Sequence, residues 1–358
     1  MAAGSAFLNV SHGESNRVLP RPYQKALVGG TLVFLLLVPV FVSSYNVHLL
    51  NLAALATIAA IGLNLLTGYC GQISLGHAAF LAIGAFTTVV LTVHAGAPFW
   101  VVVPVSGAAG AIVGFIIGLP SLRFRGIYLA ISTLAMHYAV VYGVTSYQAK
   151  VGPSASAGIT IADPQVGPVM LSDDRSWYYF LLGIVLLVTV FSVNLVRTRA
   201  GRAWMAIRDR DIAAEALGVD IAHYKLLAFM VSSTLASVAG SLAAYYNNVV
   251  TAETYTLDLA VVYLAMIIVG GMGSVLGAVF GAVFITLLPF GIDALFEFAP
   301  RSWRYGSEIF GVKQGAVGLC IILFLLFEPK GLVEIWHRIE TYFERWPFRY
   351  RPLEAERR

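Results

Sequence analysis

The feature that most constrains the fold is a long stretch without formal charge. From Ala26 to Leu122 the sequence contains no Asp, Glu, Lys or Arg. Such a stretch can supply several segments of about 20 apolar residues, the length that crosses a hydrocarbon core of about 30 Å. Hydrophobic residues make up 58% of the whole chain and charged residues only 12%. The sequence therefore predicts an integral membrane protein.

The apolar segments predict an all-α, polytopic membrane protein with about ten transmembrane helices. The expected spans lie near residues 27–43, 48–66, 77–93, 99–119, 126–147, 177–196, 226–247, 258–273, 277–296 and 312–328. With this count all four basic clusters fall on one side, which the positive-inside rule places in the cytoplasm. The expected organisation is a cytoplasmic tail (1–25), a transmembrane domain (26–330) with an external loop (148–176), and a second cytoplasmic tail (331–358).

A polar stretch from Val196 to Lys225 interrupts the apolar sequence. Its apolar residues recur at spacings of three to five, as on one side of a short helix: Trp204, Ile207, Ile212 and Leu217. Gly218 offers a helix stop, and Asp220 can cap the helix that re-enters the membrane. We expect two short helices joined by a turn on the cytoplasmic side. Such a loop either fixes topology alone or docks a cytoplasmic partner.

The residues inside the expected spans count against several classes of function. Apart from histidine, no ionisable side chain lies well inside a span, which argues against ion-coupled carriers and intramembrane enzymes. The sequence has no Walker A motif, so any ATP chemistry belongs to another chain. Cys70 and Cys320 are interpreted as small packing residues. No catalytic residue, metal ligand, cofactor or nucleic-acid partner is predicted.

Glycine breaks in two apolar segments mark a candidate solute path. The first break, within the stretch from Gly62 to Phe86, combines Gly68, Gly71 and Gly76 with uncharged polar residues. Irregular backbone at membrane depth is tolerated where protein buries it or where it lines a cavity. Helix packing through small residues is the alternative. In the second break Gly270-x-x-Gly273 echoes Gly68-x-x-Gly71. The candidate pathway residues are Asn64, Gln72, Ser74, His77, Gly270 and Gly273.

Five separated segments resemble the LivM-type permeases of branched-chain amino acid ABC importers. They are GLNLLTGYCGQISLGHAAFLAIGAF, RFRGIYLAISTLAMH, AIRDRDIAAEALGVDIAHYKLLAFMVSSTLASVAGSLAAYY, IIVGGMGSVLGAVFGAVF and FEPKGLVEI, within residues 48 to 335. The resemblance implies a type II ABC importer permease bundle in the bacterial plasma membrane. It also implies four kinds of partner: membrane lipid, a LivH-type permease subunit, two ABC ATPase subunits that bind the ATP, and a periplasmic or lipid-tethered substrate-binding protein.

Within the polar loop, Ala213-Ala214-x-x-x-Gly218 resembles the core of the EAA loop of ABC importer permeases. In that family the loop forms a coupling helix that sits in a cleft of the ATPase subunit. The position usually held by the motif's glutamate is Ile212 here, with Glu215 three residues later. The resemblance assigns coupling to the ATPase to Arg208, Asp209, Ala213, Ala214, Glu215 and Gly218.

The expected function is that of a permease subunit, which forms half of the translocation pathway for branched-chain or related amino acids. Alternative substrates in the same family are aromatic acids, urea and short amides. Alternatives of another class are an ion-coupled secondary carrier and a passive channel. Polypeptides that co-purify with the chain would separate these classes.

Overall fold

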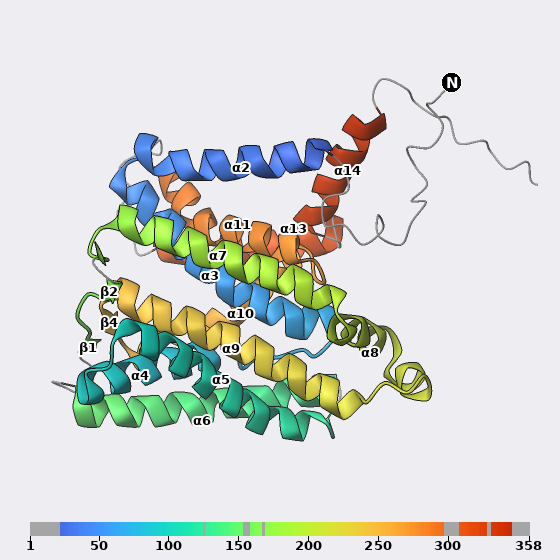
Figure 1. Cartoon of the computed structure of the whole chain (residues 1–358), viewed down its shortest axis with the longest axis horizontal. Coiled ribbons are helices and arrows are strands. Elements are labelled where there is room, and N and C mark those ends of the chain that lie inside the picture. The colour runs from blue at the N-terminus through green and yellow to red at the C-terminus, as the bar shows by residue number, and fades with distance from the viewer. Residues whose placement is uncertain are drawn as a thin grey trace, which may run out of the picture.

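The computed structural model describes residues 22–124, 126–152, 158–166, 169–296, 308–327 and 331–345, and it is built almost wholly of helices (Figure 1). The helices are α2 (Pro22–Phe41), α3 (Ser44–Leu63), α4 (His77–Ala95), α5 (Phe99–Ser121), α6 (Ile127–Val151), α7 (Asp174–Arg197), α8 (Arg199–Ala216), α9 (Ile221–Asn247), α10 (Leu257–Gly270), α11 (Val275–Phe296), α13 (Glu308–Phe327) and α14 (Leu332–Arg345). A π-helical segment, η1 (Asn64–Tyr69), continues α3, and a short 3₁₀ turn, η2 (Ala252–Thr254), precedes α10.

The helices agree with the spans expected from the sequence. Seven described segments are long and apolar enough to cross a membrane: Ser44–Tyr69, His77–Ala95, Phe99–Pro120, Ile127–Val151, Asp174–Arg197, Ile221–Asn247 and Val275–Ala294. Two shorter apolar stretches, Val28–Phe41 and Leu257–Gly270, cover the first and eighth expected spans. Helix α13 covers the last one. The prediction of an all-α, multi-pass membrane protein is confirmed.

Helix α9 lies in the middle of the bundle, packed against α3, α4 and α5 (Figure 1). Small residues allow this close approach. A Cβ atom on Gly84 would collide with the main chain of Ser237, and one on Gly240 would collide with that of Leu81. The Ser237 hydroxyl also donates a hydrogen bond of 2.8 Å to the carbonyl oxygen of Phe80. Close packing and hydrogen bonds of this kind hold helices together in lipid, where the hydrophobic effect does not drive helices to associate.

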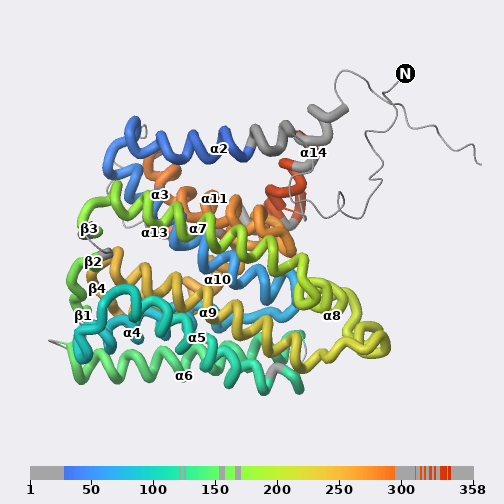
Figure 2. Tube along the Cα trace, in the orientation of Figure 1, coloured from blue at the N-terminus to red at the C-terminus, as the bar shows by residue number. Residues whose placement is uncertain are grey.

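The two ends of the bundle differ in structure. One end, the strand end, carries two small antiparallel pairs: β1 (Ile159–Thr160) with β4 (Val249–Val250), and β2 (Gln165–Val166) with β3 (Val169–Met170). Here the side chain of Gln148 accepts a buried hydrogen bond of 2.6 Å from the main-chain N–H of Ala252. The described parts of the expected external loop are therefore packed onto the bundle. The opposite end, the α8 end, carries the polar helix α8 (Figure 2).

Helix α14 packs beside α10 and α11. The rings of Trp336 and Phe280 lie 6.0 Å apart between centroids. Just before α14, Gly331 has a φ of +75° and lies so close to Gly271 that a Cβ atom would come within 2.5 Å of the Gly271 nitrogen. The segment after the last span thus begins as a packed helix, and its first residues contact the second glycine break.

Candidate functional site

Helix α8 contains a break that divides the polar loop into two short helices. At Arg210 the backbone has φ −159° and ψ 107°, an extended conformation inside an otherwise helical segment. The first helix runs from Arg199 to this point and the second from there to Ala216. Two short helices joined by a turn were expected from the sequence, and the structure confirms them.

The first half of α8 is anchored to the bundle. Trp204 is fully buried, and its indole Nε1 donates a hydrogen bond of 2.8 Å to the carbonyl oxygen of Tyr224 at the start of α9. Ile207, one turn further on, is buried as well. These contacts fix the first half of α8 against the membrane-spanning helices.

The second half of α8 exposes its large apolar side chains, whereas the predicted coupling residue Ala214 is buried. Ile212 is 71% exposed and Leu217 is 85% exposed, so the apolar stripe expected on one side of a helix is divided by the break. Gly218 ends the helix with φ +86°, and its N–H donates a hydrogen bond of 2.9 Å to the Glu215 carbonyl. Asp220 then caps α9 through a hydrogen bond of 3.0 Å from the His223 N–H. The predicted stop and cap are confirmed.

The first glycine break follows α3, where η1 widens the last helical turns before the chain becomes irregular at Cys70–Gly76. Asn64 opens η1 and is completely buried. Its Nδ2 donates a hydrogen bond of 2.7 Å to the carbonyl oxygen of Ser274, and its Oδ1 accepts one of 2.9 Å from the N–H of Gly273. A single side chain therefore clamps the second glycine break to the first.

The other candidate pathway residues occupy different environments. Gln72 and Ser74 are buried, and the Ser74 hydroxyl accepts a hydrogen bond of 3.3 Å from the Gly76 N–H. His77 is buried at the start of α4, where its Nε2 lies 3.0 Å from the carbonyl oxygen of Ala59. Gly270, the last residue of α10, packs directly against α11. These residues share one region of the fold, and their contact with solute stays a prediction.

Arg208 brings the predicted coupling residues into contact with the predicted pathway residues. Its Nη1 donates a hydrogen bond of 2.8 Å to the carbonyl oxygen of Gly68 in η1. The same nitrogen would lie 2.6 Å from a Cβ atom on Gly273, and the Arg208 side chain also covers Gly71. Its Nε lies 3.5 Å from Asp209 Oδ1, but this exposed pair adds little stability. The guanidinium thus touches both glycine breaks.

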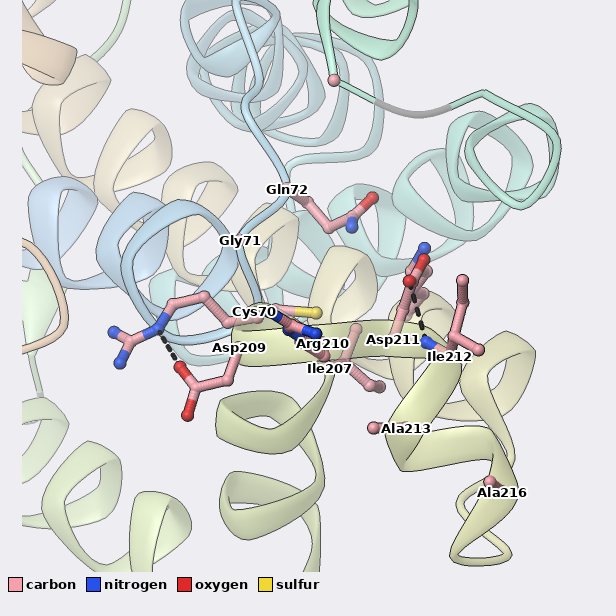
Figure 3. Close-up of a pocket in the computed structure, with 13 residues that line it drawn as sticks. Cys70, Gly71, Gln72, Ile207, Asp209, Arg210, Asp211, Ile212, Ala213 and Ala216 are labelled. Atoms are coloured by element: carbon pink, nitrogen blue, oxygen red, sulfur yellow. Dashed lines mark hydrogen bonds and ion pairs between the residues drawn. The ribbon is translucent and has the colours of Figure 1, made fainter.

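A cavity of about 620 Å³ lies between the first break and the bend of α8 (Figure 3). It is lined by Cys70, Gly71, Gln72, Gly126, Ile207, Arg208, Asp209, Arg210, Asp211, Ile212, Ala213, Ala216 and Lys225. The Oε1 atom of Gln72 is buried without a hydrogen-bond partner in the described structure. A neighbouring cavity of about 490 Å³ is lined in part by Glu215 and Gly218. The cavities thus gather polar groups from both predicted sets of residues.

Cys70 and Lys225 also line the larger cavity. Burial raises the pKa of the Cys70 thiol to about 12, so the neutral, unreactive form persists at physiological pH. Lys225 is 4% exposed. In the sequence Lys225 is only the end of the polar loop, since its position beside Cys70 depends on how α9 packs against η1. Among the described residues, no cluster of side chains could hold a metal ion.

Comparisons with known proteins identify the family. The family model described as branched-chain amino acid transport system, permease component, matches residues 45–322. The chain is 32% identical to the high-affinity branched-chain amino acid transport system permease protein LivM of Escherichia coli, over 87% of this chain and 75% of that protein. It is 24% identical to the high-affinity branched-chain amino acid transport system permease protein BraD of Pseudomonas aeruginosa, over 79% of this chain and 93% of that protein.

A LivH-type relative matches as well. The probable branched-chain amino acid transport permease protein LivH of Methanocaldococcus jannaschii is 26% identical over 80% of this chain and 91% of that protein. No solved structure matches the chain. The family match spans more than half of the chain and takes in both glycine breaks and the whole of α8. The chain belongs to the family of permease components of branched-chain amino acid transport systems.

Proposed function

We propose that the chain forms half of the translocation pathway of an ABC importer for branched-chain or related amino acids. A LivH-type permease forms the other half, two ATPase subunits bind and hydrolyse ATP, and a periplasmic or lipid-tethered binding protein delivers the solute. The substrate class follows the names of the relatives, which include LivM of E. coli and BraD of P. aeruginosa. Aromatic acids, urea and short amides are the alternative substrates within the family.

One observation carries the proposal of ATPase docking. The second half of α8 is short, packs through the buried Ala214 and exposes Ile212 and Leu217. A loop that only fixes topology needs basic residues, and exposed large apolar side chains add nothing to that role. A protein cleft that accepts this helix would bury these side chains. The proposal places the α8 end and both termini in the cytoplasm, with the strand end facing the binding protein.

The pathway proposal rests on the glycine breaks. Gln72 lines the larger cavity with a buried, unsatisfied carbonyl oxygen. A buried polar atom without a partner costs free energy, which a passing solute or water molecule can relieve. Uncharged groups of this kind offer weak contacts, which suits passage because a tightly bound solute leaves slowly.

Purification of the tagged chain from its native membrane tests the proposal. We expect two further kinds of polypeptide, an ABC ATPase and a second permease, and ATP-dependent uptake of leucine, isoleucine or valine after reconstitution with the binding protein. Ligand identification on that binding protein tests the substrate class separately. Uptake that needs only an ion gradient would favour a secondary carrier, and flux without ATP or binding protein would favour a channel.

A further inference from the structure

We infer that Arg208 is the positioning residue through which movement of the docked half of α8 reaches the two glycine breaks. This inference rests on the proposed function, because it assumes that an ATPase moves this helix. Arg208 lies two residues before the break at Arg210 and one residue after the buried Ile207. It therefore stands between the buried Trp204 and Ile207 of the first half of α8 and the exposed Ile212 of the second half.

The bond from Arg208 to Gly68 uses an acceptor that the helix itself leaves available. Gly68 lies in the last turn of η1, and carbonyl groups at a helical C-terminus lack the donors that a continuing helix would supply. The Arg208 Nη1 supplies a donor at 2.8 Å. A hydrogen bond from a charged donor is shorter and stronger than a neutral one. Displacement of Arg208 therefore removes the partner of a carbonyl group at the point where α3 stops being regular.

The same guanidinium also packs against Gly273 in the second break. Gly273 has a φ of +79°, and its missing Cβ leaves the space that Arg208 Nη1 occupies. Gly273 donates its N–H to Asn64, which opens η1. Arg208, Gly273 and Asn64 thus form one connected set of contacts from α8 through the second break to the first. A shift of Arg208 acts on both breaks together.

The chain provides a matched control on the same helix. Arg202 Nη1 donates a hydrogen bond of 2.8 Å to the carbonyl oxygen of Arg197, within the polar loop and away from both breaks. Arg202→Ala and Arg208→Ala therefore remove the same charge and the same kind of bond from α8. Only the second substitution removes a contact with the glycine breaks.

The test measures assembly, ATP hydrolysis and leucine uptake for the complete complex in proteoliposomes. For Arg208→Ala we expect normal recovery of the ATPase subunits and a fall of about tenfold in uptake per ATP hydrolysed. For Arg202→Ala we expect the wild-type ratio. Arg208→Lys keeps the charge but lacks the planar guanidinium, so its ratio should lie between those of Arg208→Ala and the wild type.

Each outcome decides a different question. Equal uptake per ATP hydrolysed for Arg208→Ala and Arg202→Ala would overturn the inference and leave the proposed function intact. If Arg208→Ala fails to assemble, the ratio for Arg208→Lys decides, and a wild-type value would likewise overturn it. A wild-type preparation that contains no ATPase would refute the proposed function itself.

Discussion

Replacement of Asn64 by alanine tests how the two glycine breaks are held together. The substitution removes two buried hydrogen bonds, to the Ser274 carbonyl and from the Gly273 N–H. Interhelical hydrogen bonds in membrane proteins contribute about 0.6–1.7 kcal/mol each. An orphaned buried group costs about 1–3 kcal/mol. Since both main-chain groups lose their partner at once, we expect Asn64→Ala to destabilise the protein by about 2–4 kcal/mol.

Thermal unfolding of the purified complex measures this loss. For a chain of 358 residues, with an unfolding entropy of about 2.1 cal/mol/K per residue, each kcal/mol lowers the midpoint by about 1.3 °C, so the expected decrease is about 3–5 °C. Asn194→Ala is the matched control, because Asn194 lies on an exposed face of α7 and surface substitutions change stability by about 0.5 kcal/mol or less. If the two variants unfold at the same temperature, the Asn64 bonds do not clamp the breaks and our account of the site is wrong.

Two further predictions concern the coupling helix and the pathway. Gly218→Pro should abolish ATP-driven uptake at normal abundance, because proline cannot adopt φ +86° and removes the N–H that bonds to Glu215. Gly218→Ala keeps that donor and should lose less activity, and wild-type uptake in the proline variant would leave α8 as a topology signal. Gln72→Leu should lower uptake per assembled complex with basal ATP hydrolysis unchanged, as measured in proteoliposomes. Wild-type uptake per complex would remove Gln72 from the pathway.

The sequence predicted those parts of the fold that depend on local chemistry. The uncharged stretch from Ala26 to Leu122 identified the first spans, since membrane insertion responds to composition over about 20 residues. Gly218 and Asp220 were recognised because a positive φ and a helix cap depend on the residue itself and its immediate neighbours. The family resemblance agreed with the comparisons for the same reason, because each of its five motifs is a continuous run of residues.

The contacts that form the site could not be predicted from local sequence patterns, because they join residues far apart in the chain. Periodicity treated Trp204 and Ile212 as one stripe, yet Trp204, before the break at Arg210, is buried and Ile212, after it, is exposed. Asn64 was a candidate for solute contact, although its partners lie about 210 residues further along the chain. Arg208 was assigned to coupling from a motif, and its bond to Gly68 depends on how η1 and α8 meet in space.

Photocross-linking from the second half of α8 tests the central claim most directly. A photoreactive amino acid at Ala213, which is exposed on α8, is compared with one at Val249, which is 46% exposed at the strand end. In whole cells we predict a cross-linked product between the Ala213 variant and the ABC ATPase, and none between the Val249 variant and that subunit. If the Ala213 variant captures no ATPase, or if both positions capture it equally, α8 is not the docking helix and the account of coupling is refuted.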